Sequence, residues 1–120
     1  MINTFDKLQV LQQAHQFVLK IYSLTQSFPL SERHRLISQI CRSSSSVPAN
    51  IVEGNSRHSK KEFIQFLYQA KGSLAETQYH LMLAKDLKII KDSEFLLLIT
   101  QSDEIGKMIS GLIKYLKNKI

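Results

Sequence analysis

The chain has 120 residues, of which 43% are hydrophobic, with only four glycines and two prolines. This length fits a single domain (residues 1–120) with a substantial core, and the composition favours long helices over a turn-rich β fold. Sixteen Lys and Arg against ten acidic residues give a formal charge of +6, which favours polyanionic partners. The most apolar run is too short to span a bilayer and the N-terminus does not resemble a secretory signal, so we expect a soluble, cytoplasmic protein and no membrane partner.

The first helix is predicted from about Phe5 to Thr25, because apolar residues recur there at spacings of three and four. The opposite face of this segment is polar and rich in glutamine. Pro29 then interrupts the pattern, and Ser31 followed by Glu32 is typical of the start of the next helix.

The second segment contains "CRSSSSVPANIVEGNSR", whose four consecutive serines and proline are typical of a linker. The apolar stripe nevertheless keeps helical phase through Pro48, which predicts one helix from about Glu32 to Glu53, bent at Pro48. Val47 counts against this interpretation, because a residue before proline disfavours helical geometry. The residues that share the stripe are Ile37, Ile40, Cys41, Ser44, Val47 and Ile51. Cys41 is therefore expected to be a small buried side chain and not a nucleophile.

The third helix is predicted from Ser59, which has Glu62 at the capping-box spacing, to about Leu87. The fourth is predicted from Asp92 to about Lys117. Because the connections are short, successive helices must be antiparallel. The sequence thus predicts an all-α, up-down-up-down four-helix bundle.

The third helix carries a second apolar stripe, displaced by about a third of a turn from the first. One stripe suffices for the core of a small bundle, so the second predicts contact with another copy of the chain. The alternative is that both stripes contact neighbouring helices within one bundle. The predicted oligomer interface consists of Ile64, Tyr68, Tyr79 and Met82.

Small residues predict close approach of helices at Ser44 and Ala49 on the second helix and at Gly72 and Ser73 on the third. A polar stripe runs along the second helix on the face opposite its apolar stripe. Its members are Arg35, Gln39, Arg42, Ser46, Asn50 and Glu53. We interpret Arg42 and Glu53 as ion-pairing residues that fix helix register, in preference to an acid–base pair.

The sequence resembles a family of four-helix-bundle proteins first noticed as reading frames in intervening sequences of bacterial 23S ribosomal RNA genes, also labelled S23 ribosomal protein. The opening of the matching pattern is Phe28, Pro29 and Glu32. Its central polar motif comprises Gln39, Arg42, Ser46, Val47, Pro48, Asn50, Glu53 and Gly54. Its later part comprises Ala70, Gly72, Ser73 and Glu76. Val52 stands where the family often has alanine.

This resemblance implies an antiparallel four-helix bundle that assembles as a ring-shaped homopentamer. A related branch, the accessory variability proteins of diversity-generating retroelements, implies a basic barrel that binds nucleic acid and a reverse transcriptase. Most of the family has no assigned activity. The resemblance gives a structural role to Gln39, Arg42, Ser46, Asn50, Glu53 and Gly54.

Two basic segments support nucleic-acid binding from the residues themselves. Between Glu32 and Lys61 there are six basic residues against two acidic ones, and the segment from Lys107 onward has four lysines and no acid. Such segments attract phosphates with little sequence preference, although a solvated lysine face would look the same. The candidate phosphate contacts are Arg33, Arg35, Arg57, Lys60, Lys61, Lys107, Lys114 and Lys117.

No enzymatic motif accompanies them: phosphate loops, dinucleotide motifs and nucleophile elbows are absent from the sequence. His58 with Glu62, and Glu76 with His80, lack the glutamate–histidine set of a bundle di-iron site. We therefore expect no enzyme, no metal and no cofactor. The first hypothesis is an oligomeric module that binds RNA or DNA, with a reverse transcriptase as a further partner in a retroelement context. The alternative is a protein-interaction scaffold without direct nucleic-acid binding.

Overall fold

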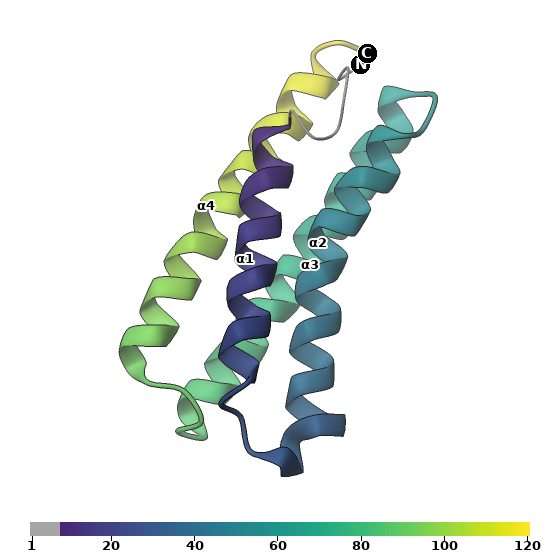
Figure 1. The fold of residues 1–120 in the computed structure, drawn as a ribbon. Coiled ribbons are helices and arrows are strands. Elements are labelled where there is room, and N and C mark those ends of the chain that lie inside the picture. The colour runs from purple at the N-terminus through teal and green to yellow at the C-terminus, as the bar shows by residue number, and fades with distance from the viewer. Residues whose placement is uncertain (1–7) are drawn as a thin grey trace.

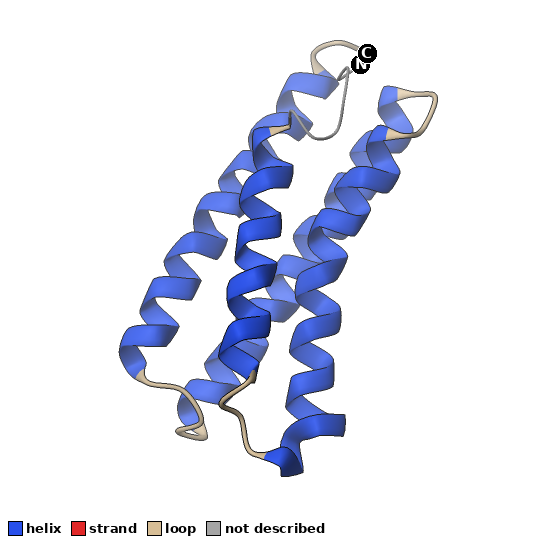
Figure 2. Ribbon diagram, viewed as in Figure 1, coloured by secondary structure: helices blue, strands red, loops and turns tan. Residues whose placement is uncertain are grey.

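The computed structural model describes residues 8–120, and these residues form four long α-helices joined by short connections (Figure 1). The helices are α1 (Gln9–Thr25), α2 (Ser38–Asn55), α3 (Lys60–Asp86) and α4 (Asp92–Lys117). No strand occurs between residues 8 and 120 (Figure 2). The predicted all-α four-helix bundle is thus confirmed. The predicted start of the first helix at Phe5 lies outside the described residues.

Successive helices alternate in direction along the bundle, which measures 46 × 23 × 20 Å. The most extensive contact joins α2 to α3, followed by α3 to α4 and α1 to α2. A smaller contact between α1 and α4 closes the bundle. Its centre contains large, fully buried side chains from all four helices, among them Phe17, Ile21, Ile40, Ile51, Phe63, Leu67, Leu81, Ile105, Ile109 and Leu116. Within residues 8–120, no helix combines the length and apolarity needed to cross a membrane.

The helix α2 continues through Pro48 without interruption, so the linker interpretation of the serine-rich segment is wrong. Ile40, Val47 and Ile51 are fully buried, as their shared phase predicted. Proline has no N–H, so the carbonyl of Ser44 loses its usual helical donor. In Figure 1, α2 is visibly curved along its length. A single burial stripe thus spans the proline.

The entry to α2 differs from a regular helix. A 3₁₀ turn, η2 (Leu30–Glu32), leads into a π-helical turn, η3 (Arg33–Ile37), before α2 begins at Ser38. A carboxylate oxygen of Glu32 accepts a hydrogen bond from the backbone N–H of Leu36 at 3.4 Å. Glu32 therefore caps the π-helical turn that leads into α2, in the N-cap role predicted near this point, but the turns before and after it are not α-helical.

The ends of α3 follow recognisable capping chemistry. The hydroxyl of Ser59 accepts a hydrogen bond from the N–H of Glu62 at 3.1 Å, as the capping-box spacing predicted. At the other end, Lys88 adopts a left-handed conformation with φ of 61°. The N–H of Ile89 donates to the carbonyl of Ala84, and that of Lys88 to the carbonyl of Lys85, both at 2.9 Å. This is a Schellman motif with lysine where glycine is usual.

Candidate nucleic-acid interface

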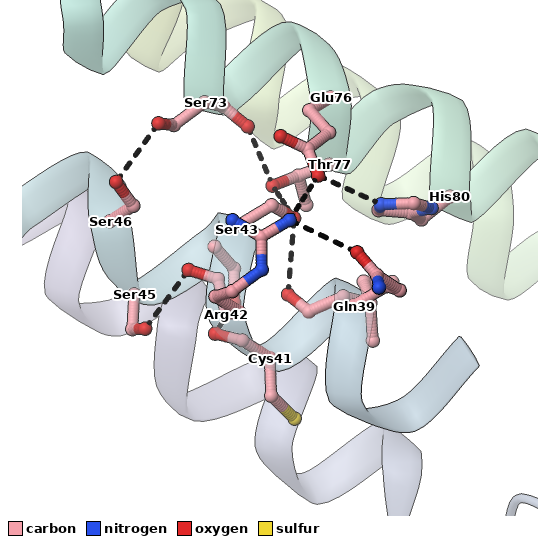
Figure 3. Close-up of polar contacts among 12 residues, drawn as sticks. Gln39, Cys41, Arg42, Ser43, Ser45, Ser46, Ser73, Glu76, Thr77 and His80 are labelled. Carbon is pink, nitrogen blue, oxygen red and sulfur yellow. Dashed lines mark hydrogen bonds and ion pairs between the residues drawn. The ribbon is translucent and has the colours of Figure 1, made fainter. Parts of the chain in front are cut away.

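Small polar side chains line the contact between α2 and α3. The hydroxyls of Ser43 and Thr77 lie 2.8 Å apart, and the hydroxyl of Ser73 donates to that of Ser46 at 3.0 Å (Figure 3). Ser43 and Thr77 are fully buried. Ser46 was predicted on a polar stripe opposite the core, and in the structure it faces α3. The short side chains at this contact let the two helices approach closely.

Gly54 also lies where the same two helices approach each other closely. A Cβ atom at this position would lie 2.7 Å from Cβ of Phe66 and 2.9 Å from a ring carbon of Phe63. Gly72 was predicted to serve the same purpose, and this prediction is wrong: a Cβ there would meet nothing within 4 Å. Gly72 points to the surface of α3, whereas Ser73 beside it faces α2.

Arg42 forms an ion pair with Glu76 of α3 at 2.7 Å and also donates to the side-chain oxygen of Gln39 at 3.0 Å (Figure 3). The ring nitrogen Nε2 of His80 lies 3.3 Å from the same Glu76 carboxylate. Glu53 pairs instead with Arg57, at 3.3 Å. The predicted association of Arg42 with Glu53 is wrong, because the register between α2 and α3 places Glu76 nearer. Both ion pairs are largely exposed.

Asn50, another member of the central polar motif, also makes contacts within the bundle. The side-chain amide of Asn50 donates to the backbone carbonyl of Ser46 at 2.8 Å and to the Ser46 hydroxyl at 3.0 Å. The motif therefore connects turns of α2 to each other and to α3.

A long open groove runs between α3 and α4, and we call it the α3–α4 groove. Its inner part is lined by Lys71, Leu74, Ala75, Gln78, Ser102, Asp103, Gly106, Lys107 and Ser110. The small residues Ala75, Gly106 and Ser110 leave this part hollow. The side chain of Gln78 crosses the groove and donates to the hydroxyl of Ser102 at 2.7 Å and to the carboxylate of Asp103 at 2.9 Å.

The α3–α4 groove continues to the end of the bundle through a series of adjoining hollows. The next hollow shares Lys71 and Ser110 with the inner part and adds Tyr68, Ile113, Lys114, Lys117 and Asn118. Two further hollows at the end of the bundle share Lys61 and Ile120. Among the described residues that line these hollows, seven are lysines, namely Lys60, Lys61, Lys71, Lys107, Lys114, Lys117 and Lys119. The acidic lining residues are Asp103 and Glu62, so the groove is strongly basic.

Five of the eight candidate phosphate contacts line this groove: Lys60, Lys61, Lys107, Lys114 and Lys117. Arg57 lies at the same end of the bundle, but its guanidinium is engaged with Glu53 and stacks over the ring of Phe66 at 4.8 Å. Sequence reasoning missed Lys71 and Lys119. Lys71 is an isolated lysine in the sequence, and only the pairing of α3 with α4 places it among the others.

Arg33 and Arg35 lie at the opposite end of the bundle, beside the start of α2. The 18 residues of α2 separate them from Arg57 by about 27 Å. Arg35 also lies 3.8 Å from the carboxylate of Glu32. The segment between Glu32 and Lys61 is therefore not one basic patch, because its charges stand at the two ends of a helix.

The predicted oligomer residues have different environments. Ile64 is buried in the chain's own core and borders the α3–α4 groove, so its assignment to an external interface is corrected. Near the start of α3, the second apolar stripe lies beside α4, because Ile64 and Tyr68 border the same hollows as Lys117. Tyr68, Tyr79 and Met82 are all more than 40% exposed. The Tyr68 hydroxyl accepts a hydrogen bond from Nζ of Lys117 at 2.9 Å.

The thiol of Cys41 is partly buried, and this burial raises its pKa above the ordinary value. The hydroxyl of Thr25, 3.9 Å from the sulfur, has a smaller opposing effect. A raised pKa lowers the thiolate fraction and hence the nucleophilicity of the sulfur. Across residues 8–120, no group of three or more His, Cys, Asp and Glu side chains is placed to hold a metal ion.

Comparison with known proteins adds a family and a solved relative. Residues 6–111 match the family described as 23S rRNA-intervening sequence protein. A crystal structure from Bacteroides thetaiotaomicron VPI-5482, described as a protein with unknown function from the S23 ribosomal protein family, is 28% identical in sequence with a TM-score of 0.77. The match covers 88% of this chain and 98% of that one. A search of curated proteins gave no match.

Proposed function

Since the chain belongs to the family of 23S rRNA-intervening sequence proteins, we propose that it is a non-enzymatic, oligomeric bundle protein that binds nucleic acid through the α3–α4 groove. It would act in the cytoplasm as an accessory or nucleoprotein factor. RNA or DNA is the proposed ligand, and a reverse transcriptase is a further proposed partner where a retroelement is present.

The observation that carries this proposal is the gathering of lysines from two helices along a series of adjoining hollows. Lys61 and Lys71 of α3 face Lys107, Lys114 and Lys117 of α4 across a groove with two acidic side chains. Lysine ammonium groups contact phosphates as point charges, and binding releases the counterions condensed on the nucleic acid. Binding of this kind reads the backbone and is steeply weakened by salt.

A mobility-shift titration across salt concentrations tests the proposal. The variant K114E/K117E reverses two groove charges, and R33E/R35E makes the same change in charge at the far end of the bundle. Loss of two phosphate contacts is expected to reduce the magnitude of the negative slope of log K against log salt by about two. It should also weaken binding at every salt concentration. The far-end variant should keep nearly the wild-type slope, because it leaves the groove intact.

Two results would overturn the proposal. One is the absence of binding to RNA and DNA at low salt. The other is equal weakening by the two charge-reversal variants, which would mean that net charge alone governs association. Circular dichroism of both variants checks that the bundle remains folded.

The proposed assembly is supported by the exposed apolar side chains of α3. Tyr79 and Met82 lie one turn apart on its outer face, with exposed fractions of 53% and 43%. Exposed aromatic and methionine side chains are enriched at interfaces between proteins. We propose a homopentamer on the family resemblance, and light scattering of the purified protein tests it: a monomer at micromolar concentration would contradict it.

The second candidate function, a protein-interaction scaffold, is favoured by the same outer face of α3. In that case Tyr79→Ala and Met82→Ala would abolish capture of a protein partner, and K114E/K117E would not affect it. The two functions are therefore distinguished by which variants lose binding: those in the α3–α4 groove or those on the outer face of α3.

A further inference from the structure

Among the described residues, Tyr68 is the one Phe or Tyr that lines the hollows of the α3–α4 groove. It lines the same hollow as Lys71, Lys114 and Lys117, midway between the inner part of the groove and the end of the bundle. Its side chain is 44% exposed. Tyr68 therefore presents an accessible aromatic ring in the wall of a basic groove.

Lys117 holds this ring in place from the other wall of the groove. Its Nζ donates to the Tyr68 hydroxyl at 2.9 Å and lies 5.4 Å from the ring centroid. This hydrogen bond places the hydroxyl end of the ring next to an ammonium group that is itself exposed. A base placed against the ring would thus have a phosphate-binding charge beside it.

This combination fits a single strand better than a duplex. Proteins that bind single strands combine a basic groove with aromatic side chains on which bases stack. In a duplex the base faces are already stacked on each other and are not available to a tyrosine. A duplex is also wider than the spacing of two packed helices, about 8–10 Å between axes, so it would touch only the rims.

We propose that the α3–α4 groove selects single-stranded nucleic acid, with a base stacked on Tyr68 and adjacent phosphates bound by Lys71, Lys114 and Lys117. This inference depends on the proposed function, since it specifies the ligand of the same groove. It assigns Tyr68 to the groove and not to the oligomer interface predicted from sequence.

Tyr115 supplies a matched control. It is 52% exposed, and Nζ of Lys119 lies 5.3 Å from its ring centroid, much as Lys117 does for Tyr68. The hollows that form the groove are lined by Tyr68 and not by Tyr115. Replacing either tyrosine removes an exposed ring beside a lysine, but only one of these rings faces the groove.

The test measures the affinity of the full chain for oligouridylate, for oligothymidylate and for a mixed-sequence duplex of the same length, at fixed low salt. Wild type should bind a single strand more tightly than the duplex. Because stacking contributes about 1–3 kcal/mol per base, Tyr68→Ala should weaken single-strand binding roughly 5- to 150-fold. Tyr68→Phe should retain most of it, since stacking needs the ring, and Tyr115→Ala should bind like wild type. Duplex binding should be unchanged in Tyr68→Ala.

A fluorescence measurement gives an independent readout. The chain contains no tryptophan, so Tyr68→Trp introduces a single reporter into the groove. Stacking of a base should quench its emission on addition of the single strand, and a Tyr115→Trp reporter should be much less affected. Equal quenching of both reporters would contradict stacking at Tyr68.

The outcomes separate this inference from the proposed function. If Tyr68→Ala binds single strands normally while K114E/K117E does not, the groove binds nucleic acid but without stacking, and the inference is overturned. If no nucleic acid binds at all, both are overturned. If light scattering shows that Tyr68→Ala and Tyr68→Phe alter the oligomeric state, Tyr68 belongs to a subunit contact and the inference is again overturned.

Discussion

Ser43 on α2 and Thr77 on α3 form a buried pair of hydroxyls, with their oxygens 2.8 Å apart. Each hydroxyl also has a backbone acceptor on its own helix: the carbonyl of Ile40 lies 3.3 Å from the Ser43 hydroxyl, and that of Ser73 lies 2.9 Å from the Thr77 hydroxyl. One hydroxyl of the pair therefore donates to the other, and the remaining proton is available to a backbone carbonyl. This buried pair links α2 to α3 across their contact.

We expect this pair to show energetic coupling. Thr77→Val, which keeps the shape of the side chain, should lower the free energy of unfolding by about 1–2 kcal/mol because it removes the contacts of the buried Thr77 hydroxyl with Ser43 and with the carbonyl of Ser73. Ser43→Ala should cost a similar amount. The double variant should cost less than the two singles together, and urea denaturation of all four proteins measures the difference. Strict additivity would show that the pair is not a unit.

The two glycines of the family pattern should respond oppositely to alanine. Gly54→Ala forces a methyl group against Phe63 and Phe66 and should destabilise the bundle by about 1–3 kcal/mol, less any gain in helix propensity. Gly72→Ala, in open space within α3, should stabilise it by up to about 1 kcal/mol. Thermal unfolding of the two variants compares them directly. A stabilised Gly54→Ala would mean that α2 and α3 separate without cost.

The ion pair between Arg42 and Glu76 is expected to contribute little to stability. Its side chains are 62% and 39% exposed, so water and salt screen the attraction. A double-mutant cycle with Arg42→Ala and Glu76→Gln should give a coupling of about 0.2–1 kcal/mol that decreases at high salt. A coupling of several kcal/mol, insensitive to salt, would contradict this assignment.

Lys88 offers a route to a more stable chain. Its left-handed backbone is strained for any residue with a Cβ atom, and glycine removes that strain. Lys88→Gly should raise the free energy of unfolding by up to about 1 kcal/mol. As a control, Lys107→Gly, in the exposed interior of α4, should lower it by about 1 kcal/mol. Destabilisation by Lys88→Gly would show that its side chain contributes more than the strain costs.

The thiol of Cys41 should react slowly with a thiolate-specific reagent. Burial raises its pKa, so at a given pH less of it is ionised than of a free cysteine, and the rate should rise as pH increases. Addition of urea should bring the rate to that of an unstructured peptide thiol. A native rate equal to the unfolded rate at neutral pH would contradict the effect of burial.

Periodicity predicted the helices well because each one buries a single face. Val47 and Ile51 keep the phase of Ile40 across Pro48, and the structure buries all three. The predicted helix boundary was less accurate at the start of α2, where a π-helical turn replaces regular helix. Nothing in the local sequence marks that geometry. The helix α4 begins and ends where its pattern predicted.

The groove was only partly predictable, because it depends on contacts between distant segments. Lys107, Lys114 and Lys117 share a helix face and were found together, whereas Lys71 joins them only through the pairing of α3 with α4. Arg33 and Arg57 were grouped by their closeness in sequence, but a whole helix separates them. The partner of Arg42 was likewise fixed by the register between α2 and α3.

The back-bonding serines of α2 also have a consequence for how the chain folds. Ser43, Ser44 and Ser45 each donate a hydrogen bond to the carbonyl three residues earlier within α2. In the unfolded chain, serine side chains can bond to nearby backbone groups in other ways and so compete with the helix. With Pro48 in addition, an isolated peptide of this segment would be mostly random coil in water. During folding, α2 should therefore acquire its helical form late, by docking onto a surface that α3 already provides.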